Sequence, residues 1–386
     1  RQMCIRDRYI YLSSLVIALS AFLFMGCDNA DYKAQGNSLY IADAAGTAKA
    51  VTITMDGGAD INVTVRLAQK LAEDVEVEIG FAPEIIAGYN ENNGTEYEAL
   101  PAEQLPQDAT VTIPAGEISA NFQLHIDDFA TNGITYAVPL ALGNVLKGNV
   151  TKSAAQGRFI YVLSKPLNVS VPVMKPRGSE NVQTDPETDW GVSVETYTLE
   201  TWVRMSNLNK NNQAIFNVRA NNEVYVRFGD ANRPYNYLQV KAHGDGGTET
   251  ARDWNTNQWY HLAIVYNGSE LIIYRDGVRV AGKQVPAPKG GMVINGLQMI
   301  SSSSTYFPAE CGMSQVRFWS YARSEAEIQN NMFFEVNPKN PNLIGLWPLD
   351  EGEGNTFRDA TGQNRDMTAG DGLIRRWEHN VRFDKK

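Results

Sequence analysis

The chain has 386 residues, more than the roughly 100 to 200 of one compact domain, so we expect two domains. Hydrophobic residues make up 43% and charged residues 20% of the sequence, which excludes an intrinsically disordered chain. The formal net charge is -10, and the lysines and arginines are scattered along the chain. Nucleic acid is therefore excluded as a partner, because a phosphate-binding face needs clustered cations.

The first 26 residues are predicted to be a signal peptide, because an apolar run at 9–25 follows Arg6 and Arg8. This run is shorter than the roughly 20 residues of a transmembrane helix, and polar residues follow it. The string LFMGC, which ends at Cys27, resembles a bacterial lipobox and implies lipidation of Cys27. Residues 27–36 would then be the lipidated cysteine and a tether. An uncleaved anchor with an incidental Cys27 is the alternative.

The other two cysteines predict neither a metal site nor a disulfide framework, because no C-x-x-C or zinc-ligand spacing occurs. Residues 1–8 begin without Met and resemble a cloning or assembly artefact, so nothing is inferred from Cys4. Cys311 is expected to be an unpaired, mostly buried thiol.

Residues 37–165 are predicted to form an immunoglobulin-like β-sandwich. Short runs alternate apolar and polar residues, as half-buried strands do, and clusters of Gly, Pro and Asn separate them. About seven such runs without a long helical period indicate an antiparallel sandwich. The runs are 51–55, 61–65, 75–79, 111–113, 122–126, 136–142 and 159–163.

The loop at 88–105, followed by the string VTIPAG at 111–116, resembles an uncharacterised Bacteroidota domain. That domain stands at the N-terminus of surface lipoproteins, ahead of glycosidase or LamG domains. The resemblance implies a spacer or a weak binding module and no catalytic residue. His125 lies on the polar side of its strand, which predicts a solvated surface histidine.

Residues 166–386 are predicted to form a second β domain, with the boundary near Pro166 in the Pro-punctuated string KPLNVSVPVMKP. Alternating runs recur, and Asn-Gly at 267–268 and Asp-Gly at 276–277 are strong hairpin signals. One helix is indicated by Ser324 and Glu327, whose spacing fits a capping box.

Five strings in this region resemble the LamG, or concanavalin A-like lectin/glucanase, superfamily: LETWV at 199–203, WYHLA at 259–263, YRDG at 274–277, VRFW at 316–319 and LWPLDEGEG at 346–354. The resemblance covers nearly all of 190–370 and implies a jelly roll of two antiparallel sheets. The whole chain is therefore expected to be all-β. Four tryptophans in these strings, and His261, are expected to be buried in the sandwich core; the tryptophans are Trp202, Trp259, Trp319 and Trp347.

No catalytic residue is predicted. Enzymes of this fold that cut β-glucans carry a Glu-x-Asp-x-x-Glu strand, which places three carboxylates in one cleft, and this spacing is absent. Glu351 and Glu353 belong to the LamG turn string. No G-x-S-x-G occurs either, and the chain has only 4 histidines. A glycoside hydrolase with unrecognised carboxylates is the least favoured function.

Ligand-binding candidates come from the loops of the second domain, where aromatic side chains stand among polar ones and could stack on sugar rings. They are Trp254, Tyr235, Tyr237, Arg233, Asp230, Trp190 and Tyr306. The alternative is that these loops only pack over the sandwich edge. No cofactor or metal site is predicted, although LamG domains often hold structural calcium, for which Asp230, Asp245 or Asp253 could serve; no EF-hand spacing supports it.

The order of signal, lipidated cysteine, spacer and lectin-like domain resembles glycan-capture lipoproteins encoded beside Bacteroidota polysaccharide-uptake systems. It implies a non-catalytic protein on the cell surface, held in the outer membrane by lipid, that binds an oligosaccharide beside an outer-membrane transporter complex. An adhesive or structural protein that binds host or matrix protein is the alternative.

Overall fold

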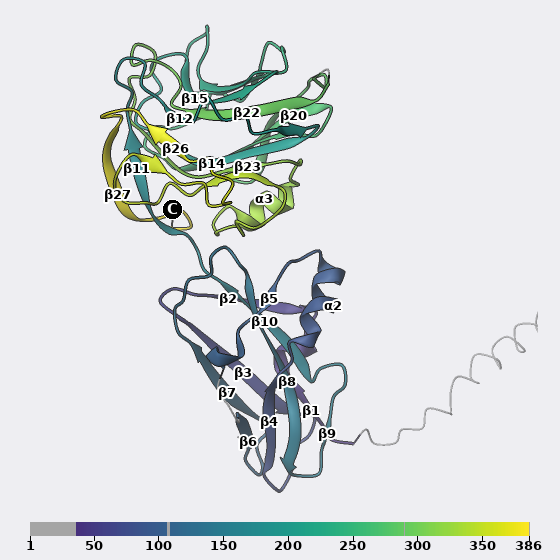
Figure 1. Ribbon diagram of the computed structural model, residues 1–386. Helices are drawn as coiled ribbons and strands as arrows, with labels where there is room; N and C mark the ends of the chain where they lie inside the picture. The colour runs from purple at the N-terminus through teal and green to yellow at the C-terminus, as the bar shows by residue number, and fades with distance from the viewer. Residues whose placement is uncertain (1–35, 106–108, 289, 386) are drawn as a thin grey trace, which may run out of the picture.

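The computed structural model describes residues 36–105, 109–288 and 290–385. The predicted signal peptide, Cys27 and nearly all of the tether lie outside these residues. Within them, no helix has the length and apolar character needed to cross a membrane. Strands between 38 and 164 build two sheets and strands between 168 and 382 build two more, one pair above the other in Figure 1. The predicted all-β class is confirmed.

The N-terminal sandwich packs a sheet of order β7-β3-β1-β9 against one of order β2-β10-β8-β4-β6, in which β5 also pairs with β8. Its strands are β1 (Ser38–Ile41), β2 (Ala50–Thr54), β3 (Ala59–Leu67), β4 (Val75–Phe81), β5 (Glu98–Ala99), β6 (Thr110–Ile113), β7 (Ser119–Ile126), β8 (Tyr136–Lys147), β9 (Thr151–Lys152) and β10 (Arg158–Ser164). In β3, Ile61, Val63 and Val65 are fully buried, and their neighbours face outward, as period-two alternation requires.

Each of the seven predicted runs lies on a strand of this sandwich, but the prediction of a wholly antiparallel fold was wrong. β1 pairs with β9, and β2 with β10, in parallel. Helix α2 (Glu84–Asn93) was also missed; of its side chains only Ile86 is buried, so its apolar periodicity is weak. It ends at Gly94, whose φ of 63° provides the left-handed cap. His125 is exposed and pairs with Asp60, as expected for a surface histidine.

The C-terminal sandwich consists of two antiparallel sheets, which we name by their distance from the N-terminal sandwich (Figure 1). The proximal sheet has the order β21-β20-β19-β14-β23-β11-β27, with β24 beside β23. Its strands are β11 (Asn168–Met174), β14 (Tyr197–Met205), β19 (Tyr260–Tyr266), β20 (Glu270–Arg275), β21 (Val278–Gln284), β23 (Cys311–Trp319), β24 (Leu343–Trp347) and β27 (Ile374–Arg382).

The distal sheet has the order β18-β17-β16-β15-β22-β12-β26-β25, with β13 beside β22. Its strands are β12 (Val182–Thr184), β13 (Val192–Val194), β15 (Gln213–Ala220), β16 (Val224–Phe228), β17 (Leu238–Ala242), β18 (Thr248–Glu249), β22 (Met292–Met299), β25 (Thr356–Phe357) and β26 (Met367–Ala369).

Local signals in this region are confirmed by the backbone. Asp276 and Gly277 connect β20 to β21 with φ of 52° and 76°, as a two-residue type I′ turn requires. Helix α3 (Glu325–Asn331) starts at Ser324, whose side chain and that of Glu327 form the predicted capping box.

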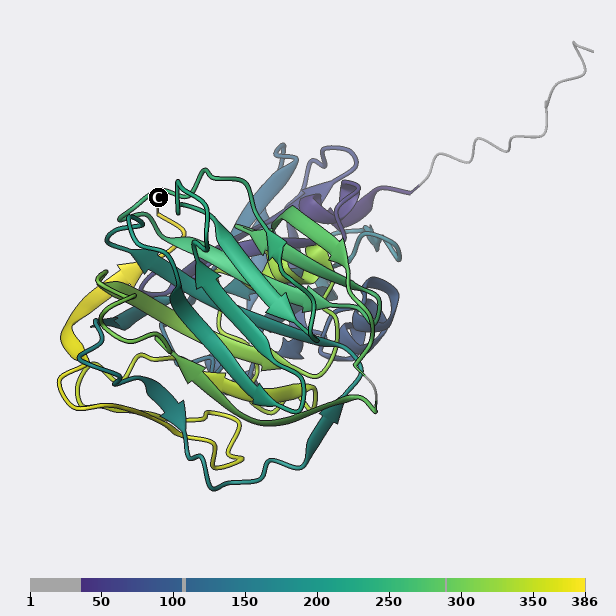
Figure 2. The same cartoon turned by 90° about the horizontal axis from the view of Figure 1, so that it is seen from above.

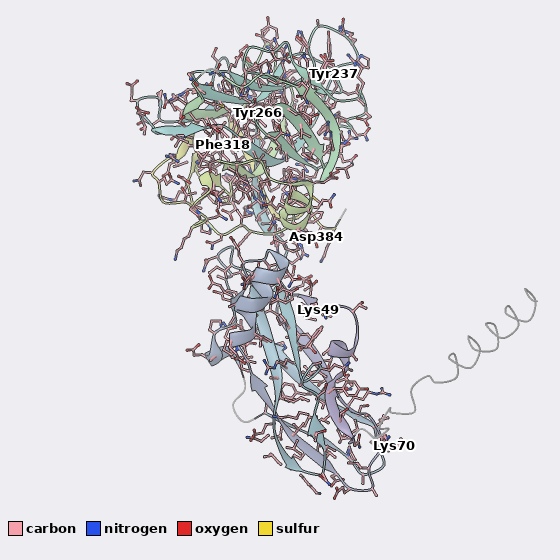
Figure 3. The ribbon with its side chains drawn as sticks, turned by 90° about the vertical axis from the view of Figure 1, so that its right-hand side faces the viewer. Lys49, Lys70, Tyr237, Tyr266, Phe318 and Asp384 are labelled. Carbon is pink, nitrogen blue, oxygen red and sulfur yellow. The ribbon has the colours of Figure 1, made fainter. Side chains whose placement is uncertain are left out.

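The main core lies between the two sheets of the C-terminal sandwich. Tyr266 and Phe318 are fully buried there (Figure 3). Cys311 belongs to the same core as a free thiol, as predicted, and burial raises its pKa far above the ordinary value of a thiol.

The four motif tryptophans do not share that core. Trp347 does lie between the sheets, but Trp202 and Trp319 belong to separate clusters beside the proximal sheet, and Trp259 is only partly buried. The Trp202 ring stacks on Phe383 with centroids 4.5 Å apart, and its Nε1 donates to the carbonyl of Met332 at 2.8 Å. The prediction of one shared core was therefore wrong, because the proximal sheet is covered on both faces.

A buried ion cluster ties the proximal sheet to the segment before α3. The Glu200 carboxylate, on β14, is fully buried and accepts a 2.8 Å bond from Arg323. Arg317 and His261, also buried, lie 3.8 Å and 3.6 Å from its other oxygen. Although burial raises the pKa of Glu200, the charges of Arg323, His261 and Arg317 lower it overall to about 2.

The connection between the two sandwiches is short, and contacts between them hold the junction. Only residues 165–167 separate β10 from β11. The Glu335 carboxylate, in the C-terminal sandwich, accepts a 2.9 Å bond from the backbone N–H of Gly133 in the N-terminal one. A Cβ at Gly133 would overlap the Val336 carbonyl, so only glycine allows this approach. Arg382 pairs with Asp56 across the same junction.

We predict that Glu200→Gln destabilises the protein at pH 7 by about 3 to 5 kcal/mol, because it leaves buried arginines without a countercharge. The folded pKa of Glu200 lies below its ordinary 4.5, so its stabilising contribution is complete above pH 4.5 and is lost as the pH falls towards 2. Denaturant unfolding should show the variant's deficit shrinking over that interval. The exposed Glu353→Gln is the control, and a deficit that is equal at pH 7 and pH 3 would contradict this account.

We also predict that Trp254→Ala lowers the free energy of unfolding by about 3 to 5 kcal/mol, as truncation of a core aromatic does. Its side chain is 2% exposed, within the main core. Calorimetry measures this loss. Tyr306→Ala, at a 44% exposed position, is the matched control and should melt like the wild type.

Candidate functional site

The outer face of the distal sheet carries polar side chains in register. Along β15, Phe216 and Val218 point into the core, so Asn217 between them points outward. The same alternation on β16 buries Val224 and Val226 and leaves Tyr225 half-exposed on the outer face.

These outward positions form one continuous row, which we call the polar row. Strand pairing places each member directly opposite the next, and at about 4.8 Å between strands the row is roughly 25 to 30 Å long. Its members, in spatial order, are Lys241, Tyr225, Asn217, Gln298, Gln183, Thr368 and Thr356. All are half-buried or exposed, and none is a carboxylate.

Tyr225 is the aromatic member of the polar row and is held in place by its hydroxyl. Its Oη donates to Asn212 Oδ1 at 3.3 Å and lies 3.2 Å from Ser302 Oγ. Both partners lie at one end of the sheet, which defines the orientation of the ring. A half-exposed aromatic ring between the amide of Asn217 and the ammonium of Lys241 is suited to stack on the C–H face of a sugar while these groups bind its hydroxyls.

A second set of polar groups on this face is buried and internally satisfied. Arg227 is 8% exposed, and its guanidinium donates to Gln239 Oε1 at 2.7 Å and 3.0 Å. It also pairs with Asp230 at 2.8 Å, and Gln239 donates to both Asp230 and Glu249. Both carboxylates are thus engaged within the protein, so this network supports the face and offers no free acid or base.

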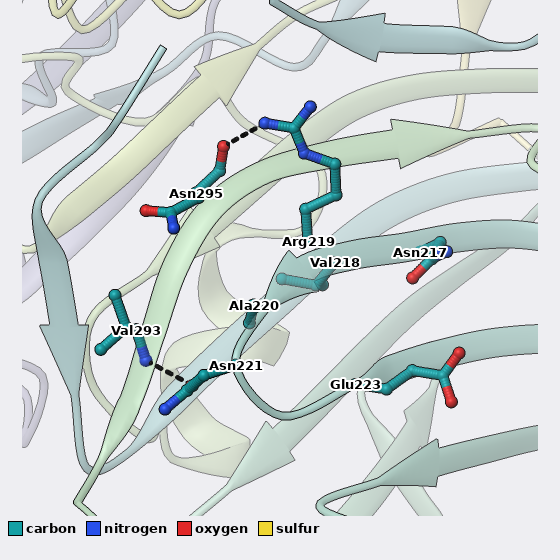
Figure 4. Close-up of a pocket in the computed structure, with 8 residues that line it drawn as sticks. All are labelled: Asn217, Val218, Arg219, Ala220, Asn221, Glu223, Val293 and Asn295. Atoms are coloured by element: carbon teal, nitrogen blue, oxygen red, sulfur yellow. Dashed lines mark hydrogen bonds between the residues drawn. The ribbon is translucent and has the colours of Figure 1, made fainter. Parts of the chain in front are cut away.

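A shallow hollow of about 570 Å³ opens at the other end of β15, beside Asn217 (Figure 4). Arg219 lines it and donates to the carbonyls of Asn295 at 2.6 Å and Pro186 at 3.2 Å. Glu223 stands on the opposite side of the hollow (Figure 4). The hollow extends the polar row and adds both hydrogen-bond donors and acceptors.

The distal sheet faces away from the N-terminal sandwich. In Figure 1 its strands lie at the top of the molecule, and in Figure 2, seen from above, they lie in front of the N-terminal sandwich. The polar row is thus accessible from the end opposite the predicted tether.

Four of the sequence-predicted residues lie at the edge of this face. Asp230 belongs to the Arg227 network described above. Tyr235 is half-buried and packs closely on Gly229, and the exposed Arg233 lies 5.4 Å from its ring. Tyr306 is exposed, with Lys210 5.9 Å from its ring. These side chains flank the polar row and do not form its centre.

Three other predicted ligand residues are buried and cannot stack on a sugar. Trp254 packs edge-on against Tyr260 at 4.8 Å, and Trp190 stacks on Trp347 at 6.2 Å. Tyr237 is 1% exposed and accepts a bond from the backbone N–H of Asp230. Trp254 and Trp190 belong to the main core, whereas Tyr237 lies outside it, with the guanidinium of Arg252 4.3 Å from its ring.

The three aspartates considered for calcium are each paired with a cation instead. Asp253 forms a bidentate pair with Arg275, and Asp245 accepts two bonds from Lys283; these hydrogen bonds hold both aspartate pKa values below the ordinary range. Asp230 pairs with Arg227. Among the described residues, no cluster of three His, Cys, Asp or Glu side chains could hold a metal ion.

The polar row itself was missed because its residues stand in strands, which the sequence analysis assigned to structure. Period-two alternation was nevertheless a usable signal. In the run Val224 to Phe228 it leaves Tyr225 and Arg227 on the face opposite the core.

Two family models match the chain. Residues 176–329 match the concanavalin A-like lectin/glucanases superfamily, and residues 32–147 match a family described as an N-terminal domain. Comparison with curated proteins gave no match.

Among the solved structures, one supports the fold of the whole chain. A Bacteroides ovatus protein described as a "putative carbohydrate binding protein" has a TM-score of 0.60 and 23% identity, over 89% of this chain and 97% of that one. A heptameric pentraxin of Limulus polyphemus has a TM-score of 0.37 and 12% identity, over 56% of this chain and 96% of that one. Bacteroides thetaiotamicron EndoBT-3987 has a TM-score of 0.27 and 17% identity, over 33% of this chain and 30% of that one. Residues 176–329 of the C-terminal sandwich are thus similar to the concanavalin A-like lectin/glucanase superfamily, and most of the N-terminal sandwich is similar to a second family.

Proposed function

We propose that the protein is a non-catalytic, lipid-anchored surface protein that captures a neutral oligosaccharide on the polar row. The observation that carries this proposal is the row itself, a line of amides and hydroxyls across seven strands around one oriented tyrosine. The lectin-like fold and the Bacteroides ovatus neighbour described as carbohydrate-binding support the ligand class. Because the row has one cation and no carboxylate, it favours an uncharged ligand.

Hydrolysis is not favoured, because a glycosidase needs two free carboxyl groups on either side of the scissile bond. On the distal face, Asp230 and Glu249 are engaged by Arg227 and Gln239. Glu351 instead stabilises its own turn, because its Oε1 accepts a 2.8 Å hydrogen bond from the backbone N–H of Arg358.

Adhesion to a protein partner is likewise not favoured. The core of a protein interface is enriched in aromatic and apolar side chains. In the described part of the chain, the exposed large apolar side chains are Leu146, Val278 and Tyr306, which stand on separate elements and form no patch.

We further propose that Cys27 carries the lipid and that the protein resides in the outer membrane, facing outward beside a transporter of the captured glycan. This proposal rests on the lipobox-like string and on the orientation of the distal face, opposite the tether. A bacterial lipoprotein carries two or three acyl chains, which satisfies the two-signal requirement for stable attachment.

We predict that Tyr225→Ala weakens oligosaccharide binding about 10- to 100-fold, equivalent to the roughly 1.4 to 2.8 kcal/mol of a central aromatic contact. Tyr225→Phe should keep most of the affinity, because the ring remains. The measurement is a glycan array on residues 28–386, followed by calorimetry on the best ligand. Tyr40→Ala, at a half-buried tyrosine on β1, is the control. Unchanged binding by Tyr225→Ala would place the site elsewhere, and release of a cleaved product would make the protein an enzyme.

We predict that Cys27→Ala abolishes incorporation of labelled palmitate when the full chain is expressed in a Gram-negative host. Cys4→Ala is the matched control and should still be labelled. Palmitate label that persists in Cys27→Ala would assign the anchor to another residue.

A further inference from the structure

A cleft of about 800 Å³ lies between the two sandwiches, at the opposite end of the C-terminal sandwich from the polar row. Small-ligand pockets in proteins have volumes of about 300 to 1,000 Å³. One wall comes from the N-terminal sandwich, from the loop at 94–98 and the loop before β8. The other comes from the end of β23, from α3 and from residues 334–342. The cleft shares no residue with the polar row or the hollow.

The C-terminal wall of the cleft is a rigid stack. Trp319 packs edge-on against Tyr321 at 6.0 Å, and the guanidinium of Arg323 lies 4.5 Å from the Trp319 ring. Arg323 is fixed in turn by Glu200, and the Tyr321 hydroxyl donates to Glu327 at 2.8 Å. The aromatic side chains of this wall are therefore oriented before any ligand arrives.

Two N–H groups in this wall have no hydrogen-bond partner in the described part of the chain. They are Trp319 Nε1 and Arg323 Nε, on side chains that are 3% and 5% exposed. A buried donor without an acceptor costs about 1 to 3 kcal/mol. Both residues line the cleft, and their unpaired N–H groups leave hydrogen-bonding capacity in this wall.

The wall from the N-terminal sandwich contributes another aromatic ring and the uncompensated charges of the cleft. Tyr97 is half-buried and stacks on Tyr89 with centroids 5.9 Å apart. Glu96 and Glu98 beside it are exposed and form no ion pair within the described residues. Lys165, in contrast, is neutralised by Asp128 at 2.7 Å. With Arg323 also paired, the uncompensated charge is negative and disfavours anionic ligands.

We propose that this interdomain cleft is a second carbohydrate site, which takes a neutral oligosaccharide between Tyr97 and Tyr321. Aromatic rings provide flat surfaces for sugar C–H faces, and amides and hydroxyls provide the donors and acceptors that sugar hydroxyls need. The polar side chains that line it include Thr135, Asn330, Asn340 and Asn342. The ligand class rests on the proposed function, but the residues and the site are independent of it.

The test compares variants of the two sites on one array of neutral oligosaccharides and their sialylated counterparts. In the Tyr225→Ala background, which weakens the polar row, the full secreted chain should still bind a subset of the neutral glycans with wild-type affinity and none of the sialylated ones. Adding Tyr321→Ala, or Thr135→Trp to fill the cleft, should reduce that remaining binding at least 10-fold. Tyr321→Phe should retain it, because the ring stays.

Thr112→Trp introduces the same side chain at an exposed position of β6, away from the cleft, and is the control for Thr135→Trp. Melting temperatures of all variants exclude misfolding. If Tyr225→Ala alone abolishes all glycan binding, or if Thr135→Trp changes nothing in that background, the cleft proposal is overturned while the polar row stands. Retained binding that prefers sialylated glycans would also overturn it. A wild-type chain that binds no glycan would overturn the proposed function and this inference together.

Discussion

The carboxylate of Glu200 is the constraint on which the C-terminal domain depends. A charge with no exposed surface is tolerated only when countercharges meet it, and here two arginines do so, from β23 and from the segment before α3. His261 on β19 lies beside the carboxylate, and burial lowers the pKa of its imidazole. Because Arg323 is one of the two arginines, the same interaction that joins β14 to the segment before α3 also fixes the aromatic wall of the cleft. Folding of the proximal sheet and preparation of the cleft are thus one event.

The two sheets of the C-terminal sandwich play different roles because they are covered differently. Every residue of β19 and of β23 is buried, since clusters below the proximal sheet occupy its outer face. The distal sheet has one covered face only. Its outward side chains remain available, and their positions are set by the strand pairing that builds the core. The binding face is therefore as rigid as the sheet that carries it.

Much of this fold could be predicted from local pattern, whereas the candidate site could not. Alternation located the strands, and the Asp-Gly turn and the capping box were read correctly because each depends on a few adjacent residues. Trp202 was misplaced because alternation says that a strand has two faces and does not say which face another segment covers. Trp254 was misplaced because its loop has no periodicity that would reveal its burial. Tyr225 was passed over for the same reason as Trp202, since only the pairing of β16 with its neighbours reveals an uncovered row.

Along β15 and β16, neighbouring residues have different roles because their side chains alternate between the core and the outer face. Phe216 and Val218 belong to the core, and Asn217 between them is half-buried on the outer face. If the polar row binds a glycan as proposed, substitutions at the outward positions can alter which sugar is preferred at little expense in folding free energy. A shift of one residue in strand register would turn the core side chains outward and the polar side chains inward. It would therefore disrupt both the core and the polar row. Glycan preference in this lineage should thus diversify by point replacement along the strands and rarely by insertion or deletion within them.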